Sequence, residues 1–299
     1  MNLSPVAIFT YARKFHLERT VNALIENYHA DRTDVYFFSD GYKKETIKEV
    51  KQVRSFIKGV KGFKSITIIE REKNFGLSEN IKLGISFIFN IQKSKEIIVV
   101  EDDIVTSKYF LEYMNVCLNE FRDKKIIGHV NSWSYPFEDG KEENIYFSDI
   151  MNCWGWGTWS DRWNKYNNNI SYWENELNHN QKVKYDLNGS GEFWPQLLAN
   201  KKNKIKTWAI FWYLTILKEG NLCVTPEISY SKNIGHDGTG QNSQKDKNYQ
   251  NTIINERKPN LVYKYIRVNK KKMKLIERYI KNKQPLIIRI LKKLRSLWY

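Results

Sequence analysis

The sequence predicts an α/β protein whose central sheet is mostly parallel and carries helices on both faces. Short apolar runs that do not alternate with polar residues recur through the first hundred positions, and stretches with helical spacing of apolar residues separate them. Strands that are buried on both faces lose polar alternation, and helices are the connections that parallel strands require. In such sheets ligands bind at the carboxyl ends of the strands.

Taken in order, the predicted elements of the first half alternate between strand and helix. Residues 5–10 form a strand, and residues 16–28 form a helix because Leu17, Val21 and Leu24 recur at spacings of three and four. Further strands are predicted at 35–38, 66–69 and 97–100. Further helices are predicted at 44–57, from an N-cap at Ser78, and from about Ser107.

The remainder of the chain has less regular patterning. Residues 131–244 are rich in Trp, Tyr, Asn and Gly and predict loops and short elements laid over one edge of the sheet, and the polar residues 245–260 predict a linker. At 283–299, Ile287, Leu291 and Leu294 recur at helical spacing opposite basic residues, which predicts a basic amphipathic helix. Such a helix suits an anionic membrane surface; docking on the domain or on a second subunit is the alternative.

Positive charge is concentrated in the C-terminal tail. The formal net charge is +16, yet residues 264–299 alone hold 13 Lys or Arg and one acid, which leaves +4 for the rest. This distribution argues against a nucleic-acid-binding domain. The three scattered cysteines suit a reducing cytoplasm. No apolar run reaches the roughly 20 residues of a membrane-spanning helix, and the first residues do not resemble a secretory signal.

Three carboxylates, Glu101, Asp102 and Asp103, follow the predicted strand at 97–100. Packed acids raise one another's pKa and destabilise a fold unless positive charge compensates them. A hard cation such as Mg²⁺ or Mn²⁺ takes carboxylate oxygens and leaves positions open for phosphate oxygens. The alternative is a solvated turn that caps the next helix. The position at the carboxyl end of a strand favours a metal or nucleotide site.

The run VVEDD after four α/β elements resembles the Asp-X-Asp motif of nucleotide-sugar glycosyltransferases with the GT-A fold. The later segments CWGWGTWSDRW, WAIFWY and KNIGHDGTG resemble, in order, the acceptor side of bacterial surface-polysaccharide glycosyltransferases. Trp208 followed by PEIS is similar to the animal N-acetylglucosaminyltransferase that starts complex N-glycans. The resemblance implies one domain at 1–244, with a nucleotide-sugar half at 1–105 and an acceptor half at 106–244, before a linker and tail at 245–299.

The resemblance also implies roles for residues at the strand ends. Asp103 would bind Mn²⁺ or Mg²⁺, which bridges the donor diphosphate, and Arg13 would meet the phosphates. Asp40, in FFSDG, would accept a hydrogen bond from the base, which favours uracil. The residues carried over as donor-binding are Thr10, Arg13, Asp40, Ser78, Glu101 and Asp102.

The general base is where the sequence departs from the resemblance. In the animal enzyme an acid follows the tryptophan that Trp208 matches, but here Ala209 follows. An inverting displacement needs a base beside the acceptor hydroxyl. Glu192, after a Gly-Ser-Gly turn, and Asp237, in a loop bounded by glycines, are the catalytic candidates, with Asp161 as a third.

Aromatic residues dominate the acceptor half. Sugar rings stack on aromatic faces, so Trp154 and Trp156 are expected to bind the acceptor, and burial in the core is the alternative. His236 is an alternative metal ligand.

Together these features predict a metal-dependent, inverting glycosyltransferase. It would move a sugar, with a UDP-sugar favoured as donor, to a surface glycan or a lipid-linked oligosaccharide. We expect it to lie at the inner face of a bacterial cell membrane through its tail and not to bind nucleic acid. A nucleotidyltransferase is one rival, although no Gly-rich basic loop follows the first strand. A non-catalytic carbohydrate-binding protein is the other, because the expected base is missing.

Overall fold

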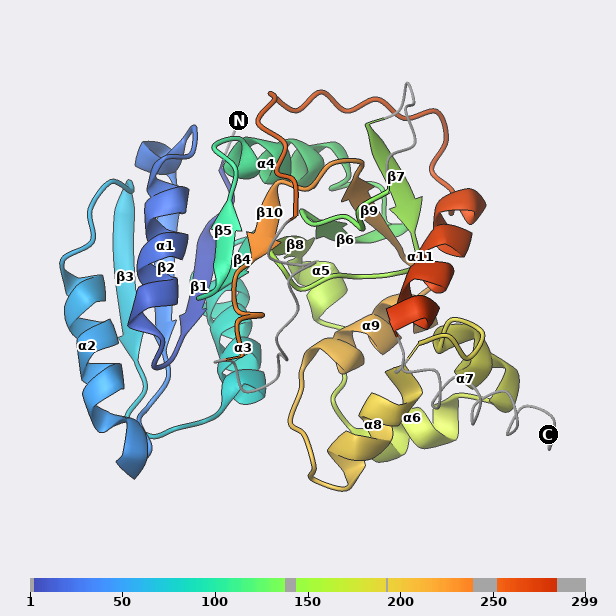
Figure 1. Ribbon diagram of the computed structural model, residues 1–299, viewed down its shortest axis with the longest axis horizontal. Coiled ribbons are helices and arrows are strands. Elements are labelled where there is room, and N and C mark those ends of the chain that lie inside the picture. The colour runs from blue at the N-terminus through green and yellow to red at the C-terminus, as the bar shows by residue number, and fades with distance from the viewer. Residues whose placement is uncertain (1–2, 138–143, 192, 239–251, 284–299) are drawn as a thin grey trace.

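The structure is a computed structural model that describes residues 3–137, 144–191, 193–238 and 252–283. An eight-stranded sheet forms its centre, in the order β3-β2-β1-β4-β8-β6-β9-β7 (Figure 1). Its strands are β1 (Val6–Thr10), β2 (Asp34–Ser39), β3 (Ser65–Glu70), β4 (Glu96–Glu101), β6 (Ile127–Asn131), β7 (Ile145–Ser148), β8 (Trp156–Trp159) and β9 (Leu222–Pro226). A separate antiparallel ribbon pairs β5 (Ile104–Thr106) with β10 (Ser231–Asn233).

The helices fall into longer and shorter members. The longer ones are α1 (Lys14–Ile25), α2 (Ile47–Lys58), α3 (Leu77–Ser86), α4 (Phe110–Glu120), α9 (Ala209–Lys218) and α11 (Lys270–Lys283). The shorter ones are α5 (Ser160–Trp163), α6 (Ile170–Glu176), α7 (His179–Tyr185) and α8 (Phe193–Lys201), together with the 3₁₀-helices η1 (Ala30–Arg32) and η2 (Lys44–Thr46) and the π-helix η3 (Phe87–Ile91).

The predicted α/β class is confirmed, and the sheet is mixed but mostly parallel. Four of the seven neighbouring strand pairs are parallel, including the whole run from β3 to β4. Neighbouring residues of β1 face opposite ways: Val6 and Ile8 pack with α1, α2 and α4, whereas Ala7 and Phe9 pack with α3, η3 and α9. Because both faces are covered, these strands read as continuous apolar runs.

The second half of the chain differs from the prediction of loops laid over one edge. Strands β8, β6, β9 and β7 extend the central sheet itself, with β8 antiparallel to β4. These strands have only four or five residues each and are broken by glycine, asparagine and tryptophan, so they carry little periodicity. Their pairing partners, which lie far along the chain, decide that they are strands.

The C-terminal region also differs from expectation in its described part. Residues 252–260 pack on the domain, since the Ser107 hydroxyl donates to the Asn255 carbonyl at 2.6 Å and the Asn255 N–H donates to the Ser229 carbonyl at 2.7 Å. Helix α11, which the sequence did not predict, buries Met273 and Ile276 against α9 (Figure 1). The amphipathic helix predicted at 283–299 lies outside the described residues apart from Lys283, which ends α11. Among the helices of the described ranges, none is long and apolar enough to cross a membrane.

Candidate active site

The sheet brings the predicted donor residues to one edge, which we call the carboxyl edge because the parallel strands β1, β2 and β4 end there. Phe9 of β1 pairs with Glu101 of β4, and Thr10 pairs with Ser39 of β2. Arg13 therefore follows β1, Asp40 follows β2, and the three acids finish β4, all at this edge. The parallel pairing of these strands is therefore enough to bring the side chains to one edge, whatever contacts they make there.

A guanidinium group bridges two of the acids. Arg13 Nη2 lies 2.5 Å from Asp102 Oδ1 and 2.6 Å from Asp103 Oδ2. Burial alone would lower the pKa of Arg13, but the charges of Asp102 and Asp103 raise it above its ordinary value. The other terminal nitrogen, Nη1, is buried and has no hydrogen-bond partner among the described residues. Arg13 thus supplies positive charge to the acids while keeping one donor group unused.

Desolvation sets the protonation of the remaining acids. It raises the pKa of Glu101 to about 8, with further contributions from the charges of Asp103 and Asp102 and an opposing hydrogen bond from the Trp208 side chain. Desolvation also raises the pKa of Asp102, although Arg13 opposes the shift. Thr10 Oγ1 lies 3.5 Å from Asp102 Oδ2, and Thr20 Oγ1 donates to the Asp102 carbonyl at 2.9 Å. Asp102 and Asp103 share the single positive charge of Arg13, so a further cation would be favourable at this cluster.

A loop from the far end of the chain closes over the acids. Strand β10 pairs with β5 directly after the acids, and the Ile234 N–H donates to the Asp103 carbonyl at 2.8 Å. A Cβ atom on Gly235 would lie 2.1 Å from Asp103 Oδ2, so only glycine fits this approach. Two residues later, Asp237 Oδ2 lies 2.9 Å from His16 Nε2. Neither His16 nor Gly235 was predicted as a site residue, because these contacts join residues more than a hundred positions apart.

Asp40 is engaged by the protein itself. Its oxygens accept hydrogen bonds from the N–H groups of Gly41, Phe75 and Gly76 and from the Asn74 side chain, at 2.8 to 3.1 Å. The residue is only 4% exposed. Asp40 therefore holds the loop that leads into α3, and the role of reading the base remains a prediction.

Ser78 does not have the capping role that the sequence predicted. Helix α3 begins at Leu77, and its N-cap is Gly76, whose φ of 77° is costly for residues with a side chain. Ser78 is half-buried in the first turn. Gly76 can take this conformation because it has no Cβ, and its N–H donates to Asp40 Oδ2 at 2.8 Å.

The two tryptophans expected on the acceptor side have different environments. Trp154 is half-buried at the carboxyl edge, where its ring lies 5.3 Å from that of His236. Trp156 is fully buried, and the rings of His129 and Trp208 stack on it at 5.1 Å each. The acceptor-binding role predicted for Trp156 is therefore wrong in this structure, because neither face of its indole is open to a sugar.

The structure treats the three candidates for the general base differently. Asp161 lies at the opposite end of the sheet, since Trp159 pairs with Glu96 at the start of β4, and it binds Lys125 at 2.7 Å. Glu192 lies outside the described residues. Asp237 is the candidate that the described part of the chain brings to the acids.

The acids suit a hard cation, but they do not form a complete coordination shell. The carboxylate oxygens of Asp102 and Asp103 are the type of ligand that hard cations prefer, and they already bind the Arg13 guanidinium. Within the residues that the structure describes, no group of three or more His, Cys, Asp or Glu side chains is arranged to hold a metal ion. A divalent ion at Asp103 would therefore depend on further oxygens from a ligand or water.

Comparison with known proteins now decides the family. The sequence model of the GNT-I family matches residues 1–186, which is more than half of the chain. The chain belongs to the GNT-I family. This family consists of N-acetylglucosaminyltransferases, and the GT-A resemblance predicted from VVEDD is confirmed at this level. A search of curated protein sequences gave no match.

Solved structures give more distant likenesses to this GNT-I family member. TarS from S. aureus aligns with 77% of this chain and 36% of its own, at 10% identity and a TM-score of 0.43. A TarS fragment, 1–349, aligns at 10% identity with 77% of this chain and 59% of its own, with a TM-score of 0.44. The mannosyltransferase PcManGT from Pyrobaculum calidifontis, in complex with GDP-Man and Mn²⁺, aligns at 10% identity with 73% of this chain and 68% of its own, with a TM-score of 0.40. The chain thus spans about a third of full TarS.

Proposed function

We propose that this chain is a metal-dependent, inverting glycosyltransferase that moves a hexose or N-acetylhexosamine from a nucleotide sugar, with a UDP-sugar favoured. The acceptor would be a surface glycan or a lipid-linked oligosaccharide. One observation carries the proposal: in a chain of the GNT-I family, Arg13 Nη2 lies within 2.6 Å of both Asp102 and Asp103 at the carboxyl edge. The tail beyond the described residues would hold the enzyme at the inner face of the membrane.

The residues at the edge divide the work of the transfer. Asp103 would hold Mn²⁺ or Mg²⁺, and the bound ion would supply Lewis-acid stabilisation of the leaving diphosphate. Arg13 would turn its unused Nη1 donor to a phosphate oxygen, which forked guanidinium groups bind well. Glu101 and Asp102 would hold hydroxyl groups of the donor. Asp40 would act by holding the loop before α3 in place.

The proton of the acceptor hydroxyl needs a base near Asp103. Asp237 would serve as this base, since it follows Gly235 by two residues and the hydrogen bond between Asp237 Oδ2 and His16 Nε2 at 2.9 Å would orient its carboxylate. Glu192 stays the alternative base. Trp154, half-buried beside His236, is the ring that we propose for the acceptor sugar.

The decisive test is calorimetric titration of the full chain with UDP and GDP, with and without Mn²⁺. We expect UDP binding that needs Mn²⁺ and that weakens at least tenfold in Asp103→Asn, a loss of about 1.4 kcal/mol. Asp161→Asn is the matched control, because this acid lies at the opposite end of the sheet, and it should bind as the wild type does. Equal UDP binding without metal, or in Asp103→Asn, would contradict the proposal.

A second candidate function has one observation in its favour. Ala209 stands where the resembling animal enzyme has its base, so the chain could bind a nucleotide sugar without transferring it. Hydrolysis of a panel of UDP-sugars separates the two. Slow release of free sugar that is lost in Asp237→Asn supports catalysis, whereas tight UDP-sugar binding with no release from any donor supports binding alone.

A further inference from the structure

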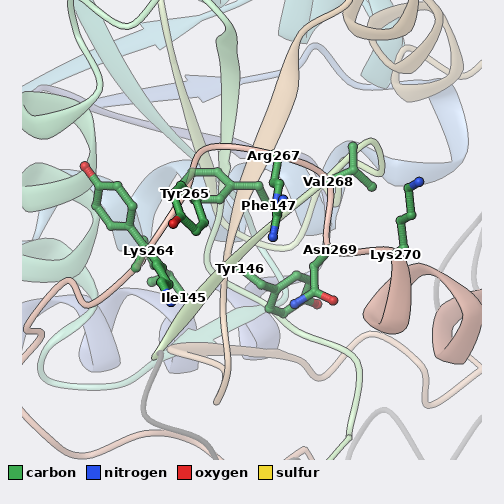
Figure 2. Close-up of a pocket in the computed structure, with 10 residues that line it drawn as sticks. Ile145, Tyr146, Phe147, Lys264, Tyr265, Arg267, Val268, Asn269 and Lys270 are labelled. Atoms are coloured by element: carbon green, nitrogen blue, oxygen red, sulfur yellow. The ribbon is translucent and has the colours of Figure 1, made fainter.

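A cavity lies away from the acids, along the outer side of β7 at the end of the sheet. Its volume is about 430 Å³, within the range of small-molecule sites. Strand β7 forms one wall and residues 263–270 form the other, joined by the bridge between Phe147 and Val268 (Figure 2). The cavity is thus part of the packed domain and does not depend on the predicted tail.

Aromatic rings make up much of the lining. Tyr146 and Phe147 of β7 are buried beneath it, and Tyr263 and Tyr265 come from the opposite wall. Tyr265 is 57% exposed, so much of its ring is accessible to a ligand. The face of an aromatic ring carries negative potential and attracts C–H groups. Such a lining suits the C–H face of a sugar ring.

Three positive side chains accompany these rings. Lys264, Arg267 and Lys270 line the cavity, and none of the ten described lining residues is acidic. Figure 2 shows Arg267 in the middle of the group, with Lys264 and Lys270 on either side in this view. The guanidinium of Arg267 stacks 5.0 Å from the centre of the Tyr265 ring. Positive charge and a ring face are therefore presented together.

The lysines at the start of α11 are placed unfavourably with respect to the helix dipole. Lys270, Lys271 and Lys272 open α11, whose first turn contains no acid. Lysines near a helix N-terminus are repelled by the helix dipole. Lys272 is compensated by Glu227 at 2.5 Å, whereas Lys270 lines the cavity. A bound anion would relieve the repulsion among the cations that line the cavity.

We propose that this cavity binds an anionic sugar unit, with its ring on Tyr265 and its negative group at Arg267 and Lys270. This sugar unit belongs to the acceptor, an assignment that rests on the proposed function. Strand β7 is four strands from β4 in the sheet, a separation of about 19 Å at about 4.8 Å per strand. The acceptor is therefore an extended, negatively charged glycan that contacts the enzyme at both ends of this span.

The test uses ligand-observed NMR titration of the full chain with glucose 6-phosphate, glucose and inorganic phosphate. Glucose 6-phosphate should bind at least tenfold more tightly than glucose or phosphate. The double variant Arg267→Gln/Lys270→Gln should weaken it at least tenfold. Lys51→Gln/Lys61→Gln is the matched control, since these lysines are exposed at the other end of the molecule, and it should bind as the wild type does. Tyr265→Ala should weaken glucose 6-phosphate but leave phosphate unchanged.

Two results would overturn the proposal. Wild-type binding by the Arg267→Gln/Lys270→Gln variant places the ligand elsewhere. Equal binding of phosphate and glucose 6-phosphate, both insensitive to Tyr265→Ala, describes an anion site with no sugar recognition. Titration with UDP and Mn²⁺ keeps the two proposals separate, because the cavity variants should bind UDP normally. If UDP fails to bind but glucose 6-phosphate binds as expected, the donor site is wrong and the cavity assignment holds.

Discussion

At the scale of single residues, Arg13 contacts the Asp103 carboxylate that we propose as the ligand of a divalent cation. Arg13 Nη2 lies 2.5 Å from Asp102 Oδ1 and 2.6 Å from Asp103 Oδ2, so a single positive charge is shared by two carboxylates. Arg13→Gln should therefore lower the melting temperature of the metal-free protein. It should also raise the affinity for free Mn²⁺ about tenfold, because a like charge no longer opposes the ion. Electron paramagnetic resonance of Mn²⁺ measures this directly.

The control for Arg13 lies on α1, the helix that begins directly after it. Arg19→Gln removes an equal charge from an exposed position of α1 that stacks on Phe15, and it should change neither quantity. Mn²⁺ affinity that is unchanged or reduced in Arg13→Gln would show that the guanidinium does not occupy the position of the cation.

At the scale of elements, an ion pair between Lys272 of α11 and Glu227, the residue after β9, holds α11 on the domain. Lys272 is 1% exposed and donates to Glu227 Oε2 at 2.5 Å, next to the Tyr146 ring. Lys272→Ala leaves the Glu227 carboxylate poorly compensated and should reduce the free energy of unfolding by roughly 3 kcal/mol in urea titrations. Lys274→Ala, an exposed site on the same helix, should stay within about 0.5 kcal/mol of wild type. Equal effects of both changes would mean that α11 is not held by this pair.

At the scale of the whole molecule, His129 makes stability depend on pH. It is fully buried on β6, accepts from Trp212 Nε1 at Nδ1 (3.1 Å), and lies 3.1 Å from the Asn152 carbonyl through Nε2. These contacts fit the neutral ring, and desolvation lowers the pKa of His129 to about 3. The unfolded chain takes up this proton near pH 6.5, so the folded state loses stability as the pH falls below that value.

The size of this pH effect follows from the two pKa values. Between pH 7 and pH 5 the free energy of unfolding should fall by about 2 kcal/mol because of His129. Urea titrations at each pH measure this change. His129→Asn should flatten that slope, although it lowers stability overall. His179→Asn, at an exposed position, should keep the wild-type slope. A slope that persists in His129→Asn would assign the effect to other groups.

The local sequence pattern was sufficient to predict the strands of the donor half, but it was insufficient to predict those of the acceptor half. The runs at β1, β2 and β4 are long, apolar and buried on both faces, so composition alone predicts them. Strands β6, β8 and β9 contain His129, Trp156 and Thr225 in short segments, and they are strands because distant partners pair with them. Tertiary context of this kind overrides local propensity.

The candidate site divides in the same way. The sequence by itself determined that Arg13, Asp102 and Asp103 would share one edge, because residues that follow parallel strands meet there whatever the rest of the chain does. Only the tertiary structure decided that Gly235 and Asp237 cover that edge, that Trp156 is closed off between two rings, and that the chain opens a cationic cavity beside β7. Those features arise from contacts between residues far apart in the chain, and their positions are settled by packing, which no local pattern records.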